Sequence, residues 1–206
     1  MKKVSELTAE EFKKAFPIEV KAYNKAYKAR YGIERDRILG AIDPEGVVRI
    51  NHIGSTAVEG LLSKPMVDIL LEMDGCCNVT KLLDALKGIE YGVEILTRRE
   101  DPLRLLLAKG CSVDGFAEQV YLLHVRYVGD WDELYFRDYL IAHPEVSEAY
   151  AQLKLQILKD IEEGRIERLP NGNPNGYSNA KLDFVRQHTE IARREFENRY
   201  KPAAKA

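Results

Sequence analysis

The sequence predicts an α+β fold, in which a mixed β-sheet is flanked by helices and followed by a C-terminal helical lobe. Residues 47–53 alternate like a half-buried strand, and residues 66–73 form an apolar run typical of a central strand. From residue 131 onward apolar residues recur at helical spacing. We therefore expect two lobes that share one site, an α/β core with N-terminal helices over residues 1–130 and a helical lobe packed on it over residues 131–206.

The N-terminal region is expected to be helical. Thr8 and Glu11 have the spacing of a capping box, which predicts a short helix that ends before Pro17. A second helix is predicted from Pro17 to Gly32, because residues suited to a buried stripe step along one face: Val20, Tyr23, Tyr27 and Tyr31. Residues 33–41 favour a further short helix, which the following Asp-Pro pair closes.

The sheet should begin with the strand at 47–53, whose end is marked by a Gly-Ser turn. A brief helix is expected at 56–62, then the central strand at 66–73 and a crossover helix at 79–86. Three further strands complete the predicted mixed sheet, at roughly 91–97, 103–109 and 119–128.

The C-terminal third is predicted to be helical up to residue 163, and again from about Ser178. Between these segments lies a Pro-, Asn- and Gly-rich loop at 169–176, which will not continue a helix.

The charge balance disfavours broad capture of nucleic acid. The formal net charge is −2 and the isoelectric point is near 6.1, whereas such binding draws on clustered Lys and Arg that release counterions. No apolar run approaches the length of a membrane span, and the first residues lack the hydrophobic segment of a signal peptide. We expect a cytoplasmic protein with a small-molecule ligand and no membrane partner; the sequence does not indicate an oligomeric state.

The most informative motif is the stretch around Gly54 and Ser55, followed by Asp68 inside the central strand. A Gly-Ser pair that leaves a strand offers backbone N–H groups and a hydroxyl to phosphate oxygens. An unpaired buried carboxylate is unfavourable, so Asp68 is expected at the mouth of a site where a cation or a donor satisfies it. The alternative is an ordinary turn and a carboxylate that accepts from an N–H group.

The string HIGSTAVEGLLSKPMVDILLEM at residues 52–73 resembles the signature of the GrpB family, whose members have a nucleotidyltransferase (polymerase-beta-like) fold. Further blocks agree in order: residues 115–117 and 122–145, Tyr150 with Lys154, and Tyr177 with Lys181. In the fold that this sequence resembles, a Gly-Ser pair grips the phosphates of a nucleoside triphosphate. An Asp-x-Asp/Glu pair and a third carboxylate then hold the metals.

The sequence departs from that pattern at the second carboxylate, where Leu70 cannot ligate a metal. Glu72 is a weak substitute, because it lies roughly 13 Å along the strand from Asp68. His124 stands in for the third carboxylate, as a ligand better suited to Mn²⁺ or Zn²⁺ than to Mg²⁺, or as a general base. The family's His-x-His pattern is incomplete here, since Leu122 takes the first place.

The expected site therefore has two parts. Asp68 and His124 are the candidate catalytic and metal-binding residues, for Mg²⁺ or Mn²⁺, and His52 and His124 facing Asp68 would make a mixed site. The candidate phosphate-binding residues come from both lobes: His52, Gly54, Ser55, Thr56, Lys64, Arg137, Lys154, Tyr177 and Lys181.

Several of these residues have structural alternatives that remain open. The alternative for either histidine is a hydrogen-bonded structural residue, for Lys64 a pair with Asp68, and for Lys154 and Lys181 a solvated lysine. Arg137 is favoured slightly as the partner of Asp138 in an ion pair that links the lobes.

Two functions fit this sequence. The first is a nucleotide-dependent transferase that moves a nucleotidyl group to an unknown acceptor. The second is an inactive module that binds a nucleotide or another phosphorylated metabolite, and the loss of the second carboxylate at Leu70 favours it.

Overall fold

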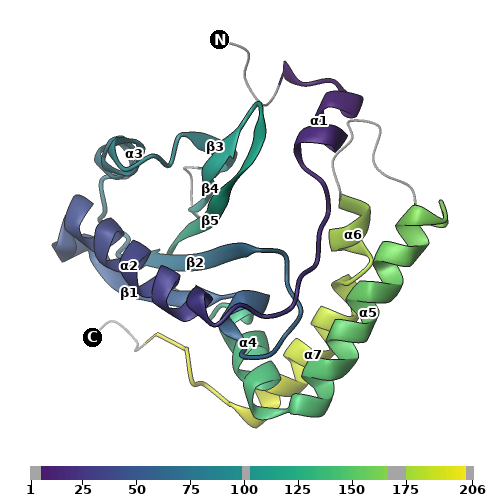
Figure 1. Ribbon diagram of the computed structural model, residues 1–206. Helices are drawn as coiled ribbons and strands as arrows, with labels where there is room; N and C mark the ends of the chain where they lie inside the picture. The colour runs from purple at the N-terminus through teal and green to yellow at the C-terminus, as the bar shows by residue number, and fades with distance from the viewer. Residues whose placement is uncertain (1–5, 99–102, 167–174, 203–206) are drawn as a thin grey trace.

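The computed structural model describes residues 6–98, 103–166 and 175–202. A five-stranded mixed sheet forms its centre, in the order β1-β2-β5-β4-β3 (Figure 1). β2 and β5 pair in parallel, and the other neighbours pair antiparallel. The strands are β1 Val47–Ile53, β2 Met66–Met73, β3 Val93–Arg98, β4 Arg104–Ser112 and β5 Gly115–Tyr127. The helices are α1 Ala9–Ala15, α2 Ala26–Ala41, α3 Val79–Gly88, α4 Asp132–Ala142, α5 Pro144–Glu162, α6 Asn175–Asn179 and α7 Leu182–Glu195. The predicted α+β class is confirmed.

The N-terminal prediction is half right. α1 starts at a capping box in which the Thr8 side chain accepts from the Glu11 N–H, and the Glu11 carboxylate accepts from the Thr8 N–H. The predicted helix from Pro17 is wrong, because Lys21 instead exchanges two backbone hydrogen bonds with Ser63. α2 begins only at Ala26 and continues through Gly32 to Ala41.

Two of the predicted short helices differ from the structure. The helix expected at 33–41 is the second half of α2, because that helix continues through Gly32 without a break. The helix expected at 56–62 is a single 3-10 turn at Ser55–Ala57.

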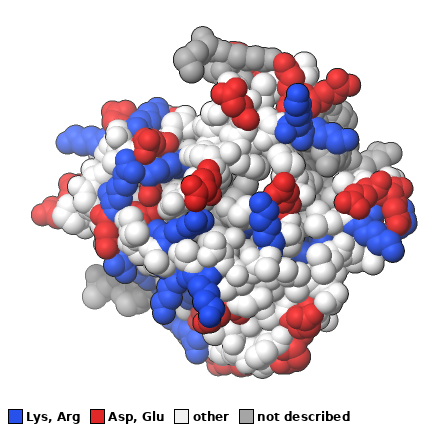
Figure 2. Space-filling model, viewed as in Figure 1, with Lys and Arg blue, Asp and Glu red and all other residues white. Residues whose placement is uncertain are grey.

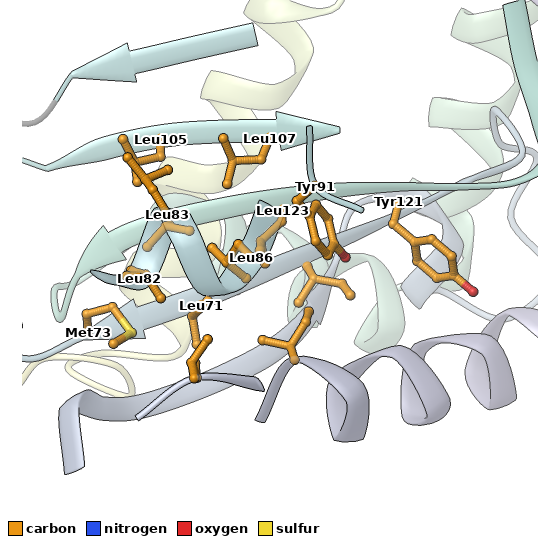
Figure 3. Packing of buried hydrophobic residues seen from close by; sticks show 14 of the residues in the cluster. Leu71, Met73, Leu82, Leu83, Leu86, Tyr91, Leu105, Leu107, Tyr121 and Leu123 are labelled. Carbon is orange, nitrogen blue, oxygen red and sulfur yellow. The ribbon is translucent and has the colours of Figure 1, made fainter. Parts of the chain in front are cut away.

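One face of the sheet carries the main hydrophobic core. Alternate residues of β2 (Val67, Ile69, Leu71 and Met73) pack there with α2 and α3 in one cluster of buried residues. Leu82, Leu83 and Leu86 of α3 fill this layer, and Figure 3 shows them beside Leu71, Met73 and Leu123. This core fixes which side chains of β2 turn to the other face.

The opposite face of β2 presents Asp68, Leu70 and Glu72 toward the helical lobe. Leu70 is fully buried there, in a cluster with Ile53 of β1 and Leu134 of α4. The lobe joins the sheet through α4, which lies between β1 and α7. In Figure 1 the helices α4, α5, α6 and α7 gather on one side of the sheet.

The final helix is interrupted. The sequence predicted one helix from about Ser178, but α6 ends at Asn179 and α7 starts at Leu182. The turn-rich loop predicted at 169–176 lies almost entirely outside the described residues. Within the described ranges, no helix combines the length and the apolar character that crossing a membrane requires.

On the face shown in Figure 2, basic and acidic side chains are interspersed. This view carries no broad area of one charge sign of the kind that a nucleic-acid surface presents.

Candidate functional site

The turn after β1 lies directly against the carboxylate of Asp68. Ile53, the last residue of β1, is the register partner of Asp68 in β2. Gly54 follows with a φ of 70°, and a Cβ atom at this position would lie 2.7 Å from Asp68 Oδ2. Only glycine satisfies both the backbone conformation and this close approach. The turn and the strand carboxylate therefore form one site.

A substitution of Gly54 tests this contact. Gly54→Ala is expected to destabilise the protein by about 1–3 kcal/mol, because the methyl group meets the Asp68 carboxylate and the positive φ is strained. Chemical denaturation measures the loss. Gly60→Ala is the matched control, since its φ is 82° with nothing within 4 Å of an added Cβ. Equal losses in the two variants would show that the contact with Asp68 contributes nothing.

His124 is the partner of Asp68. Its Nε2 atom lies 3.1 Å from Asp68 Oδ1, a hydrogen bond between neighbouring strands β5 and β2. Both side chains are about a quarter exposed and so remain accessible. Among the described residues no third His, Cys, Asp or Glu joins them in a cluster that could hold a metal. The protein supplies two candidate ligands here.

Glu72 belongs to a different arrangement. Its carboxylate is fully buried, and Arg49 of β1 donates to both of its oxygens at 2.8 Å and 2.6 Å. The Gly129 N–H donates to the same carboxylate. These donors occupy Glu72, so it does not replace the missing second carboxylate.

His52 is turned away from Asp68. It pairs in register with Ile69, which belongs to the core under α2, and its ring stacks on Tyr31 of α2 with centroids 4.8 Å apart. Its Nε2 atom lies 3.0 Å from Thr56 Oγ1. Burial lowers the pKa of His52 to about 4, against the attraction of Asp68. His52 is thus neutral at physiological pH and braces the turn through Thr56, whereas the mixed site with His124 does not form.

Arg137 holds the turn from the other lobe. Its Nη1 atom donates to the His52 carbonyl oxygen at 2.9 Å, and its Nε and Nη2 atoms donate to Asp138 Oδ1. Nη2 also donates to the Tyr200 hydroxyl. The predicted ion pair with Asp138 is present, but it does not link the lobes. The link is the hydrogen bond from Arg137 to the backbone of β1.

Three lysines from separate segments lie at Ser55 and at the nearby Tyr177 ring. Lys154 of α5 is buried, and its Nζ atom lies 3.2 Å from Ser55 Oγ and donates to the Leu62 carbonyl oxygen. The Nζ atoms of Lys64 and Lys181 lie 4.6 Å and 4.2 Å from the centroid of the buried Tyr177 ring. The solvated alternative for Lys154 is wrong, because α5 carries this side chain into the interior.

The charges of this lysine cluster (Lys64, Lys154 and Lys181) are only partly offset within the described residues, where the charge of Asp68 favours the protonated forms of Lys64 and Lys181. No carboxylate of the described residues forms a salt bridge with any of the three. Burial, and then the charge of Lys181, lowers the pKa of Lys154 to about 7. Burial and the charge of Lys64 lower the pKa of Lys181 to about 8, and Asp68 opposes this shift. Burial also lowers the pKa of Lys64.

Tyr150, which the sequence motifs paired with Lys154 without giving it a role, contacts that lysine in the structure. It lies one helical turn before Lys154, whose Nζ atom is 4.5 Å from the Tyr150 ring centroid. Each lysine of the cluster lies over an aromatic ring, Lys154 over Tyr150 and the other two over Tyr177. The ring attracts the ammonium group and so favours the charged lysine without a carboxylate. The i, i+4 spacing of Tyr150 and Lys154 was the available signal.

A model of the family described as GrpB protein matches residues 17–191. The chain belongs to the GrpB family. The glutamate-rich protein GrpB of Alkalihalophilus pseudofirmus is 34% identical over 151 residues, which cover 72% of this chain and 80% of that protein. The protein YqkA of Bacillus subtilis is 26% identical over 182 residues, 86% of this chain and 48% of YqkA, so the chain spans about half of YqkA.

The crystal structure of the conserved protein GrpB from Enterococcus faecalis superposes with a TM-score of 0.70 at 21% identity, over 86% of this chain and 99% of that one. This likeness shows that the two proteins share a fold, and it carries no residue roles.

Proposed function

We propose that this GrpB-family chain binds a nucleotide, or another small molecule with a phosphate chain, at the lysine cluster beside Ser55. The observation that carries the proposal is the grouping of three buried or half-buried lysines that form no salt bridge with any carboxylate of the described residues, so that only the more distant charge of Asp68 acts on Lys64 and Lys181. Buried charges are normally paired, so an arrangement of this kind is balanced by an anion that arrives from outside. Phosphate oxygens have the charge and the acceptor capacity required.

A divalent cation fits beside this anion at Asp68. Mg²⁺ commonly binds through one or two carboxylates, and completes its shell with water and substrate phosphates. Asp68 supplies one such carboxylate, and the imidazole of His124 would extend the site to Mn²⁺. A cation held by Asp68 would neutralise part of the phosphate charge.

Binding without two-metal transfer is the function that the residues favour. Leu70 fills the position of the second carboxylate with a packed apolar side chain. Nucleotidyl transfer with a single cation is the second candidate, because Asp68 lies against the Gly54 turn and is hydrogen-bonded to His124. Release of pyrophosphate from a nucleoside triphosphate together with a nucleotidylated acceptor, and without the free nucleoside monophosphate that hydrolysis would give, would establish transfer if Asp68→Asn abolishes it.

Thermal shift measurements test the binding proposal. Nucleoside triphosphates or inorganic tripolyphosphate, with Mg²⁺ or Mn²⁺, should raise the melting temperature, since a ligand at one hundred times its dissociation constant adds about 2.7 kcal/mol. Lys181→Met should remove most of the shift, and Asp68→Asn only the part that depends on the cation.

Lys159→Met is the matched control, because Lys159 lies on the exposed side of α5 with 64% of its side chain accessible. This variant should respond like the wild type. If no phosphate chain raises the melting temperature with either metal, the proposal is wrong.

A further inference from the structure

A cavity of about 260 Å³ lies between the Gly54 turn and the helices α4, α5 and α7. Its apolar walls include Phe136 of α4, Tyr150 of α5 and Val185 of α7. Tyr150 meets Phe136 edge to face with centroids 5.3 Å apart, and stacks on Phe184 at 5.2 Å. Rings packed against one another in this way form rigid walls, which suit a flat apolar occupant.

The charged groups around this cavity are already satisfied. Glu133 accepts from Arg126 at 3.0 Å, and Asp132 accepts from Arg193 at 2.6 Å. Arg137 is bonded to Asp138 and to the backbone of β1. Each of these charged residues already has a partner of opposite charge within the protein. The cavity therefore suits an uncharged group.

One polar group in the wall is unsatisfied. Thr189 of α7 lines the cavity and is only 5% exposed, and its hydroxyl has no hydrogen-bond partner among the described residues. Buried polar groups are nearly always hydrogen-bonded, so an orphaned hydroxyl on a residue that lines a cavity points to a partner that the described residues do not supply. The occupant should therefore carry a donor or an acceptor on its edge.

The cavity adjoins Lys154 of the lysine cluster. Ser55 lines the cavity and accepts from Lys154, and Tyr150 forms one wall while its ring contacts the same Nζ atom. A single ligand can thus place its phosphates on the lysines and extend its remaining part past Ser55 into the cavity.

We propose that this cavity holds an uncharged ring with a hydrogen-bonding edge, of the size of a nucleobase, and that Thr189 bonds to that edge. The inference rests on the proposed function, and names the part of the ligand that the phosphate site leaves undefined. The ring belongs to the phosphorylated ligand itself.

Calorimetric titration tests this assignment. ATP, GTP, CTP, UTP and inorganic tripolyphosphate are titrated, each with Mg²⁺, into the wild type and the variant Thr189→Val. At least one nucleotide should bind the wild type ten times more tightly than tripolyphosphate does. Thr189→Val should weaken that nucleotide about fivefold and change the affinity for tripolyphosphate less than twofold.

Two further variants keep the result interpretable. Val185→Phe fills the cavity and should remove the preference for the nucleotide, while the exposed Thr80→Val is a control that should change nothing. Thr189→Val should melt no lower than the wild type, because the change removes an unpaired buried hydroxyl at nearly constant shape.

The outcomes separate the two proposals. If tripolyphosphate and every nucleotide bind equally, the ring site for the ligand's own base is wrong and the phosphate site stands. A nucleotide preference that Thr189→Val and Val185→Phe leave intact overturns the assignment of this cavity. If nothing binds, the proposed function itself fails.

Discussion

Replacing Lys154 with methionine is expected to raise the melting temperature of the ligand-free protein and to abolish its binding of phosphate chains. Lys154 is 1% exposed and holds a charge that no carboxylate of the described residues pairs with. Exchanging a buried charge for an apolar side chain of similar volume is often stabilising, by about 1–3 kcal/mol, or roughly 3–10 °C for a chain of this size. The loss of the bonds to Ser55 and Leu62 offsets part of this gain.

The effect of this substitution should depend on pH in a defined direction. The pKa of Lys154 is lowered from 10.5 to about 7 in the folded state, so the unfolded chain binds more protons between these values. The wild type therefore gains stability as the pH rises from 7 toward 10.5. The advantage of Lys154→Met should be largest below pH 7 and fade across that range, as denaturant titrations at pH 6, 8 and 10 would show.

The same shift predicts the proton balance of binding. An anion favours the charged lysine, so binding at pH 8 should take up protons and weaken as the pH rises. Calorimetry in buffers of different ionisation enthalpy measures this uptake. The exposed Lys159→Met should alter neither the stability profile nor the uptake; a ligand-free Lys154→Met that melts below the wild type at pH 6 would contradict the argument.

The sheet could be predicted from the sequence where local pattern and tertiary environment agree. β1 and β2 match their predicted bounds because alternation and a continuous apolar run are direct consequences of one or two buried faces. The segment from Pro17 to Lys25 could not be predicted in this way. Its one aromatic residue, Tyr23, does pack against the core, but a backbone bridge from Lys21 to Ser63, distant in sequence, replaces helical hydrogen bonds.

The candidate site shows the same division. Gly54 and Asp68 could be placed together from the sequence because they end one strand and occupy the next. The burial of Lys154 could not, since it depends on how α5 packs against the Gly54 turn. Strand alternation alone would have placed His52 on the face opposite Asp68. Ile53 is the register partner of Asp68 and shares its face, and the adjacent residue His52 therefore points to the other face.

The second large effect concerns stability rather than binding. Arg49→Met is expected to destabilise the protein by about 3–5 kcal/mol, because it leaves the fully buried Glu72 carboxylate without a cationic partner. Arg49 also donates to the carbonyl oxygens of Gly129 and Tyr200, so its loss loosens the attachment of the C-terminal segment. Urea denaturation measures the change. Arg35→Met is the control, since the ion pair of Arg35 with Asp36 is exposed and contributes little.

The double variant Arg49→Met with Glu72→Met shows whether an unpaired buried charge causes the loss of stability. If the destabilisation comes from an unpaired buried charge, removing both partners should restore stability to within about 1 kcal/mol of the wild type. Full loss in the double variant would instead assign the effect to the backbone bonds of Arg49. Cation-dependent binding of tripolyphosphate should survive in the double variant and disappear in Asp68→Asn. The Glu72 carboxylate is buried and neutralises Arg49, whereas the Asp68 carboxylate is accessible to an ion.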